Sequence, residues 1–479
     1  MQGGIVKLVD INDYITPNQS CIKSLAETVK GKKGNEVKKI TLDDCLSCTG
    51  CITSSEALLI NNFTLDNHFS LIKDNFKNDA SFKLGIISYQ ALESFLIVYK
   101  QLKNIQDYNI NYYNEITNII AEILNIDFIL PLNDFILFTL NLSFNEFLER
   151  KNMGLGIGTI STECPGWVCY AEKKIGKISF GHMSNIKSPH EIASIIIKAI
   201  FEKYFSKINN SSNNKDIIYS SAKNLYICSI MSCFDKKIEP IKNKNGINTV
   251  ISTIELEDKF KEFLNKKSIP NNRLINIHIL KNFLDLNQNI KETKESINKQ
   301  ISDNKNNFQI NISLYNFIFN ENYSSNFYIE YFIYRIKNLN PNCFIERKPG
   351  KNIDSKEIFI YNNETKTEII YKFLISYGLR NIQNIVRMIK SNSVKYDYIE
   401  LMACPGGCIN GAGQIRVEKT RDNIFNEINN GFNYFKEGKN DIDKSINDIE
   451  KIVTEFNIDK NKFKQTFKEA DFSKSDLDW

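Results

Sequence analysis

The chain has 479 residues, and at roughly 150 residues per domain this length suggests two or three domains. Its 61 Lys and Arg against 56 Asp and Glu give a net charge of +5, which excludes an extended basic arm for nucleic acid and an acidic tail. Hydrophobic residues make up 42% of the sequence and charged residues 24%, so a sizeable core can be buried. The 11 cysteines are an odd number, so they cannot all pair as disulfides.

Neither the N-terminal residues nor the most apolar stretch predicts a membrane or export segment. Residues 1–15 contain acidic residues and no apolar run, unlike a signal peptide. The most apolar stretch, 123–142, is broken by Asp127, Pro131 and Asp134, whereas a membrane helix needs about 20 predominantly apolar residues. We therefore expect a soluble intracellular protein, whose clustered cysteines serve metal or redox chemistry before disulfides.

Beyond residue 80, short apolar runs alternate with helical patterns. We expect strands at 84–89, 157–161, 224–231, 358–361 and 396–402, and helices at 90–103, 376–390 and about 442–456. Ser188, Pro189 and Glu191 form a capping box that begins a further helix. About 90 residues, 257–349, show no regular pattern, and the last twenty are polar and expected to be mobile. The alternation predicts an α/β fold with mainly parallel sheets.

The first cysteine group is Cys45, Cys48 and Cys51, with Cys21 upstream. Spacing of two residues lets successive thiolates converge on one small inorganic core, and a fourth, distant cysteine completes the ligands of a [4Fe–4S] cluster. A four-cysteine zinc site is the alternative, although zinc sites usually use two separated C-x2-C pairs. Gly50 permits a close approach of the backbone to the cluster.

The second cysteine group is dispersed along the chain. Each member lies just after an expected strand, where α/β sheets place their sites. The Pro-Gly-Gly turn at 405–407 exposes N–H groups that can donate to sulfur. The group consists of Cys164, Cys233, Cys404 and Cys408. The other cysteines of this region lie in or near apolar runs and are interpreted as structural: Cys169, Cys228 and Cys343.

Six segments in order resemble the iron-only hydrogenase-like family, and within it the cytosolic iron–sulfur protein assembly factors, also called nuclear prelamin A recognition factor-like proteins. They are residues 11–17 before Cys21, then 45–54, 164–173, 231–239, 377–384 and 402–414. The resemblance implies two [4Fe–4S] clusters. Cys21, Cys45, Cys48 and Cys51 would hold the first, and Cys164, Cys233, Cys404 and Cys408 the second.

The resemblance also implies a domain order. A small N-terminal iron–sulfur domain (1–75) would precede a hydrogenase-like large domain of two α/β lobes with mainly parallel sheets. The first lobe would span 76–256, and the second 257–425 with an Asn/Lys-rich insertion at about 257–318. Residues 426–479 would form a C-terminal helix and a mobile tail.

In function, the resemblance implies an adaptor of cytosolic iron–sulfur assembly. It would bridge an early P-loop NTPase scaffold and a late targeting complex that contains a β-propeller, in the cytoplasm and also the nucleus, without nucleic acid or membrane as partner. The tripeptide Leu477, Asp478 and Trp479 resembles the tails by which clients and adaptors of that pathway dock. Two negative charges and an indole suit a basic, aromatic-lined pocket.

An active iron-only hydrogenase is the enzymatic alternative, and a zinc-stabilised interaction protein is the structural one. Active hydrogenases carry a proton-relaying cysteine where this chain has Glu163, and Met-Pro-Cys where it has Met231, Ser232 and Cys233. Lys236 aligns with a lysine that binds the di-iron unit of hydrogenases, although a lysine pair is usually a solvated surface feature. Without the relay thiol, we expect no hydrogenase activity.

Overall fold

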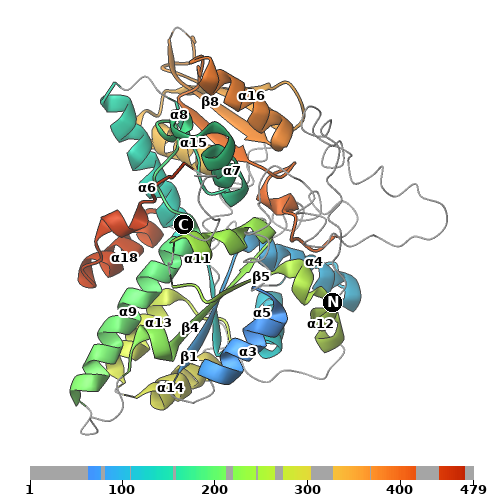
Figure 1. Cartoon of the computed structure of the whole chain (residues 1–479), viewed down its shortest axis with the longest axis vertical. Helices are drawn as coiled ribbons and strands as arrows, with labels where there is room; N and C mark the ends of the chain where they lie inside the picture. The colour runs from blue at the N-terminus through green and yellow to red at the C-terminus, as the bar shows by residue number, and fades with distance from the viewer. Residues whose placement is uncertain are drawn as a thin grey trace, which may run out of the picture.

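The computed structural model describes residues 63–76, 81–107, 109, 111–154, 158–211, 219–243, 246–264, 273–287, 289–303, 327–366, 368–416 and 442–469. These residues form two α/β lobes, the first on a four-stranded sheet and the second on a five-stranded sheet (Figure 1). No helix among the described residues combines the length and apolarity that a membrane crossing requires.

The first sheet is entirely parallel, with the strand order β2-β1-β4-β5. Leu84 pairs with Phe128 on one side and with Ile227 on the other. After β1 the chain adds β2 on one side of it and then β4 on the other side. The carboxyl ends of β1 and β4 therefore form a topological switch point. The strands are β1 (Phe82–Ile87), β2 (Phe128–Pro131), β4 (Leu225–Met231) and β5 (Thr249–Ser252).

Helices cover both faces of this sheet because successive residues of each strand point to opposite sides. In β4, Leu225 and Ile227 belong to one buried cluster, while Tyr226, Cys228 and Ile230 belong to another. One face carries α3 (Leu65–Asn75), α4 (Tyr89–Lys103), α5 (Asn111–Leu124) and α12 (Thr253–Leu264). The other carries α9 (Pro189–Ser211) and α13 (Ile277–Leu286), with α14 (Ile290–Asp303) beside α13.

The second sheet mixes parallel and antiparallel pairs in the order β3-β9-β8-β7-β6. β3, β9 and β8 are parallel, and β8, β7 and β6 form an antiparallel meander. The strands are β3 (Thr159–Ile160), β9 (Tyr398–Met402), β8 (Ile369–Tyr377), β7 (Ser355–Tyr361) and β6 (Phe344–Pro349).

Aromatic side chains join helices α6 (Asn133–Asn152) and α15 (Tyr328–Leu339) to this sheet. The ring of Phe147 on α6 lies 5.6 Å from that of Phe373, and Phe332 on α15 lies 4.5 Å from Tyr398. α18 (Ile442–Glu455) packs on α6. The remaining helices are α7 (Pro165–Tyr170), the π-helical turn η3 (Ala171–Ile175), α8 (Lys177–Phe180), α10 (Ser221–Asn224), α11 (Ile238–Asn243), α16 (Leu379–Lys390), and the 3-10 turns η4 (Phe234–Lys237), η6 (Cys408–Asn410) and η7 (Lys460–Phe463).

The expectation of an irregular stretch at 257–349 is wrong. This range holds the end of α12, all of α13, α14 and α15, and β6. Leu280, Leu284 and Ile297 are nearly fully buried, so the Asn- and Lys-rich composition conceals helices with a single apolar stripe. The expected helix at 376–390 begins only at Leu379, because the preceding residues belong to β8.

The chain crosses between the sheets more often than a simple division into lobes suggests. β3 lies within the range assigned to the first lobe but pairs with β9 of the second sheet. The domain limits at residues 75, 256 and 425 remain predictions.

Candidate metal centre

The carboxyl ends of the two sheets face one another across the segment 404–416, which follows β9. In this segment the carbonyl of Cys408 accepts a hydrogen bond of 2.9 Å from the Ser232 hydroxyl, just after β4. The carbonyl of Gly413 accepts one of 3.0 Å from the hydroxyl of Thr253, just after β5. Residues that follow β4 and β5 of the first sheet therefore meet the segment that follows β9 of the second sheet, at the kind of strand end where α/β folds place their sites.

Three strand ends and one turn supply the four cysteines of the second group. Cys164 comes four residues after β3 and precedes α7, Cys233 comes two residues after β4, and Cys404 comes two residues after β9. Cys408 begins η6. The side chains of Cys233 and Cys404 are in hydrogen-bonding contact, and all four cysteines interact electrostatically. The structure thus brings four distant cysteines together.

Backbone N–H groups and two glycines determine the local structure around these sulfurs. The amide N–H of Ala403 donates to the Cys164 sulfur over 3.3 Å. Gly406 and Gly407 have φ values of 76° and 79°, which a residue with a side chain adopts at a cost, and they turn the chain back toward Cys408. The Gly406 N–H donates to the Asp354 carboxylate over 2.9 Å, which holds this turn in place.

Burial opposes ionisation of the four thiols. It raises the pKa of Cys164 to about 12, with a further contribution from nearby Cys233. Burial, Glu163 and the other thiols raise the pKa of Cys408 well above its ordinary value. The group is therefore protonated without metal, and metal binding must displace the protons, as at other thiolate sites.

The donor set fits a [4Fe–4S] cluster. Four sulfurs are the ligands that such a cluster takes, and each binds a different iron, so they do not meet at one point. Within the described ranges, no three His, Cys, Asp or Glu side chains converge on a single-ion site. The indole N–H of Trp167, three residues after Cys164, is fully buried without an acceptor, and cluster sulfur accepts such hydrogen bonds.

The neighbouring lysines after Cys233 are buried, which corrects their interpretation as a solvated pair. The Lys236 ammonium donates to the carbonyl of Glu163 over 2.7 Å and to Glu239 over 3.0 Å. The Lys237 ammonium points elsewhere and donates to the carbonyl of Phe63 over 2.6 Å and to Glu255. Adjacent residues of η4 thus tie the Cys233 loop to two different parts of the chain.

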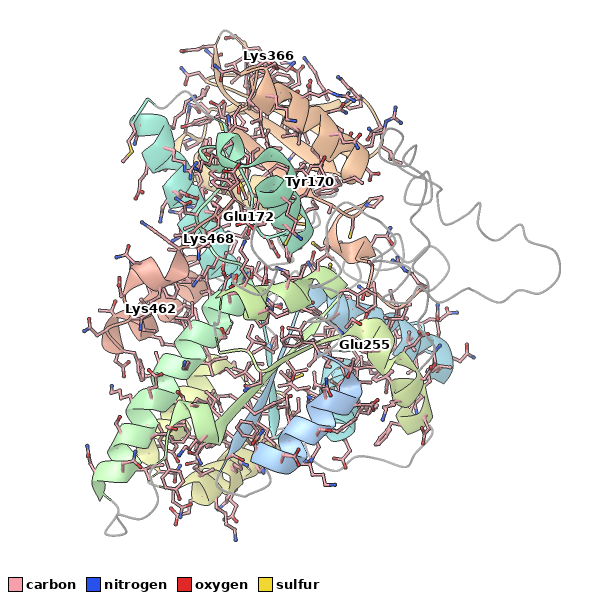
Figure 2. All side chains as sticks on the ribbon, viewed as in Figure 1. Tyr170, Glu172, Glu255, Lys366, Lys462 and Lys468 are labelled. Carbon is pink, nitrogen blue, oxygen red and sulfur yellow. The ribbon has the colours of Figure 1, made fainter. Side chains whose placement is uncertain are left out.

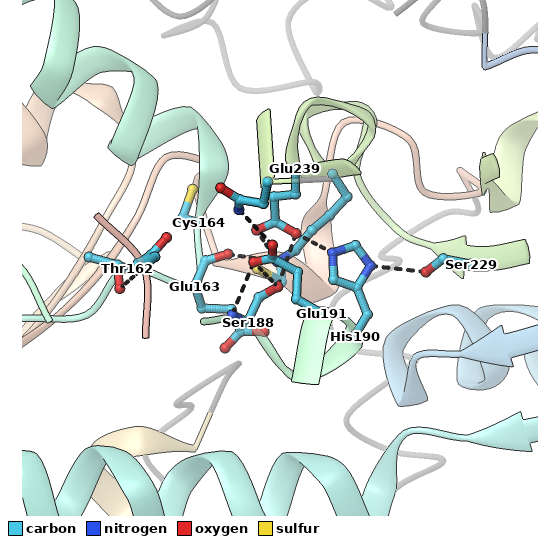
Figure 3. Close-up of polar contacts among 12 residues, drawn as sticks. Thr162, Glu163, Cys164, Ser188, His190, Glu191, Ser229 and Glu239 are labelled. Carbon is cyan, nitrogen blue, oxygen red and sulfur yellow. Dashed lines mark hydrogen bonds and ion pairs between the residues drawn. The ribbon is translucent and has the colours of Figure 1, made fainter. Parts of the chain in front are cut away.

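A buried polar network is centred on Glu239 and His190 (Figure 3). Glu239 accepts hydrogen bonds from Lys236 and from the Ser188 hydroxyl, the latter over 3.0 Å, and it contacts His190. His190 also hydrogen-bonds Ser229 on β4 over 3.0 Å. Burial opposes the ionisation of Glu239, but Lys236 and His190 lower the pKa of Glu239 to about 2, so the Glu239 carboxylate is charged.

The sequence did not reveal this network, although the capping box contains part of it. The Glu191 carboxylate accepts from the Ser188 backbone N–H, as the motif predicts, and also from the Ser188 hydroxyl. The motif gave no sign that His190 turns inward, because its partner Glu239 lies 49 residues further along the chain. A lysine and a glutamate three residues apart on η4 and α11 were the only local signal.

Glu163 lies near buried tyrosines and within electrostatic reach of Cys408. Its carboxylate is in hydrogen-bonding contact with Tyr328. The Tyr398 hydroxyl is buried without a partner, while Tyr377 donates to Glu400 over 2.5 Å. The place where hydrogenases carry a relaying thiol, by the resemblance above, holds a carboxylate surrounded by phenols.

Several predicted site residues lie outside the described ranges. These are the first cysteine group, Cys21, Cys45, Cys48 and Cys51, and the tripeptide Leu477, Asp478 and Trp479. The cysteines interpreted as structural are all buried, and two of them, Cys228 and Cys343, belong to the apolar core clusters; the third is Cys169.

Comparison with solved structures relates the fold to hydrogenases. [FeFe]-hydrogenase HydA1 from Chlamydomonas reinhardtii aligns with a TM-score of 0.57 at 14% identity, over 84% of this chain and 98% of that one. HydA(deltaEFG), described in terms of stepwise H-cluster assembly, aligns with a TM-score of 0.58 at 14% identity, over 85% and 98%. This similarity shows the fold alone.

Sequence comparison is more specific. The family model described as the iron-only hydrogenase large subunit, C-terminal domain, matches residues 135–412. The probable cytosolic Fe–S cluster assembly factor narfl of Dictyostelium discoideum is 31% identical over 488 residues, covering 88% of this chain and 86% of the relative. A probable cytosolic Fe–S cluster assembly factor of Anopheles gambiae is 28% identical over 461 residues, covering 87% and 85%.

The fold and the matched residues define an iron-only hydrogenase-like protein. More particularly, the chain belongs to the cytosolic Fe–S cluster assembly factors of that family. The family predicted from the six sequence segments is thereby confirmed.

Proposed function

We propose that the chain is a non-catalytic assembly factor for iron–sulfur proteins, which works in the cytoplasm and holds two [4Fe–4S] clusters. Cys164, Cys233, Cys404 and Cys408 would bind the second cluster. The observation that carries this proposal is their convergence between the facing carboxyl edges of the two sheets. Cys21, Cys45, Cys48 and Cys51 would bind the first, on the strength of their spacing.

The test compares the metal content of matched cysteine variants. Anaerobically purified wild type, Cys404→Ser, Cys48→Ser and Cys343→Ser are analysed for iron, acid-labile sulfide and zinc. We expect each ligand variant to lose about half of the iron and sulfide, since each loses one of two equal clusters. Cys343→Ser, which removes a buried sulfur away from the centre, is expected to keep both. Zinc without sulfide would contradict the proposal and favour the zinc-stabilised interaction protein.

The hydrogenase alternative is tested by its own reaction. Glu163 stands at the position of the relay thiol, and its carboxylate contacts Tyr328, so a proton cannot pass through sulfur there. We expect no hydrogen uptake by the loaded wild type, and none after Glu163→Cys substitution, because the di-iron unit is also required. Hydrogen uptake by the wild type would make the chain an enzyme.

We also propose that the protein bridges an early P-loop NTPase scaffold and a late targeting complex with a β-propeller subunit. The curated relatives support the general role by their names. Leu477, Asp478 and Trp479 would dock on the targeting complex through a basic, aromatic-lined pocket.

Removal of Trp479 tests the docking role. We expect its deletion to abolish pull-down of the targeting complex while iron and sulfide contents stay at wild-type levels. Phe472→Ala serves as the control for a nearby aromatic residue outside the tripeptide. Unchanged pull-down after deletion of Trp479 would remove the docking role and leave the cluster assignment intact.

A further inference from the structure

The residues that follow α18 return to the candidate metal centre instead of ending at the helix. Residues 463–469, here named the C-terminal strap, run beside the chain that flanks Cys164. Phe463 is nearly fully buried, and its ring lies 5.7 Å from Phe138 of α6. The ring of Phe467 lies 5.8 Å from Phe180 of α8. Two aromatic side chains therefore hold a segment that is otherwise polar.

The strap binds the chain just before Cys164. The side-chain amide of Gln465 donates to the Thr162 hydroxyl over 2.7 Å and to the carbonyl of Ile186 over 3.1 Å. The Gln465 amide N–H donates to the carbonyl of Asn185 over 2.6 Å. Thr162 itself donates to the carbonyl of Ser184 over 2.8 Å, so Gln465 completes a small network two residues before Cys164.

The strap also binds the chain just after Cys164, through the buried carboxylate of Glu172 (Figure 2). Glu172 lies in η3 and is 1% exposed. One of its oxygens accepts a hydrogen bond of 3.0 Å from the backbone N–H of Lys468, and the other is paired with the ammonium of Lys242. Lys242 belongs to α11, the helix that follows the Cys233 loop.

Glycine lets the end of the strap approach closely. A Cβ atom on Gly176 would lie 2.4 Å from the Glu469 carboxylate, and Gly176 has a φ of 71°. The strap thus contacts the chain on both sides of Cys164, from Gln465 beside Thr162 to Glu469 beside Gly176.

The strap binds where the segment that follows Cys164 meets the helix that follows Cys233, so its docking depends on how these two segments are placed relative to each other. Glu172 joins the chain that follows Cys164 to the helix that follows Cys233, and Lys468 binds the same carboxylate. A cluster bound by both cysteines would fix the same relationship, because its four thiolates stand at fixed separations. Metal binding and strap docking therefore both favour the same relative placement of the segments that follow Cys164 and Cys233. Each event should then stabilise the other, because such coupling is reciprocal.

We propose that loading of the Cys164, Cys233, Cys404 and Cys408 set seats the C-terminal strap. The inference rests on the proposed function. It assigns to Gln465 and Glu172 a coupling role: an empty factor holds its strap loosely, whereas a loaded factor holds it firmly.

Hydrogen exchange measured by mass spectrometry tests the coupling directly on the full chain. Peptides that cover 463–469 are followed in loaded wild type, in wild type stripped by chelator under anaerobic conditions, and in Cys48→Ser. We expect stripping to speed exchange of the strap by about tenfold, as a typical allosteric coupling gives. Cys48→Ser, which loses the first cluster alone, is expected to exchange at the loaded rate. Equal rates before and after stripping would overturn the inference.

The reciprocal arm uses substitutions that loosen the strap. Gln465→Ala and Glu172→Gln are expected to increase the rate at which chelator removes iron from the second site by about tenfold, by the same linkage. Lys462→Ala, an exposed position just before the strap, serves as the control and is expected to keep the wild-type rate. Unchanged rates in both strap variants would also overturn the inference.

The outcomes separate this inference from the proposed function. If the wild type contains no iron or sulfide after anaerobic purification, the cluster assignment itself fails. If it contains both but the strap is insensitive to their removal, the assignment stands and only the coupling fails.

Discussion

The ammonium of Lys236 lies 3.0 Å from a carboxylate oxygen of Glu239, in the interior between the two lobes. Both side chains are more than 90% buried, and burial alone would favour their neutral forms. Glu239 and Glu163 nevertheless raise the pKa of Lys236 above its ordinary value, so the ammonium stays charged. A fixed cation therefore stands beside the cysteine group, within electrostatic reach of Cys408.

Loss of this cation should make the second cluster harder to reduce. A [4Fe–4S] cluster with four thiolates is anionic and gains a further negative charge on reduction, which a nearby ammonium stabilises. We expect Lys236→Met to lower the midpoint potential by on the order of tens of millivolts, for a unit charge at an effective dielectric constant of about 20. Lys237→Met is the control, since its ammonium faces Phe63 and Glu255. The midpoint potential is measured by potentiometric titration with paramagnetic resonance as the readout. Equal potentials in both variants and the wild type would contradict a role of Lys236 in tuning the cluster.

A methyl group on Gly411 should separate the two halves of the centre. Its Cβ would lie 2.2 Å from the backbone carbonyl oxygen of Ser232, which cannot move without shifting Cys233. We expect Gly411→Ala to destabilise the fold by about 1–3 kcal/mol, the usual cost of overpacking, and to reduce iron at the second site. Gly181→Ala, where nothing lies within 4 Å, should be silent. Thermal unfolding measures the change in stability, and iron analysis measures the loading of the second site. A full iron content in Gly411→Ala would contradict the assigned centre.

Strand ends and their cysteines were predictable from the sequence, because buried strands such as 225–231 and 398–402 are mainly apolar and are followed by Ser232-Cys233 or Ala403-Cys404. The contacts that shape the centre were not predictable. Lys236 meets Glu163 across 73 residues, and Gln465 meets Thr162 across 303. Local sequence patterns give no information about partners so distant along the chain. For the same reason, the sequence predicted a mobile polar tail at residues 464–469, which in fact make specific contacts.

Glu330 should make stability depend on pH. It is 5% exposed, and burial outweighs Arg347 to raise its pKa from 4.5 to about 7. The native state therefore holds a proton that the unfolded state has released, and stability falls as pH rises from about 4.5 to about 7. At 1.36 kcal/mol per pH unit, the loss reaches about 3 kcal/mol at most.

Urea unfolding of the metal-free protein between pH 5 and pH 8 measures this effect. Relative to Glu330→Gln, which cannot titrate, the wild type should lose stability as pH rises across this range. A constant difference between the two proteins at every pH would show that Glu330 titrates normally.

The two proposed clusters should differ in lability. Cys164 is 5% exposed and Cys233 8%, while Cys404 and Cys408 are half-buried, so two of the four ligands of the second site are shielded from chelators. We expect the iron that remains in Cys48→Ala, at the second site, to be lost at least about tenfold more slowly than that in Cys404→Ala. Equal loss rates in the two variants would remove any basis for assigning transfer to the first cluster.

The most direct measurement is quantitative paramagnetic resonance of the anaerobically purified, dithionite-reduced wild type, combined with iron and sulfide analysis. The account predicts about eight iron and eight sulfide per chain and about two reduced cubane spins, one of which disappears in Cys404→Ser. A single cubane spin in the wild type that survives in Cys404→Ser would contradict it, because the four cysteines between the lobes would then hold no cluster.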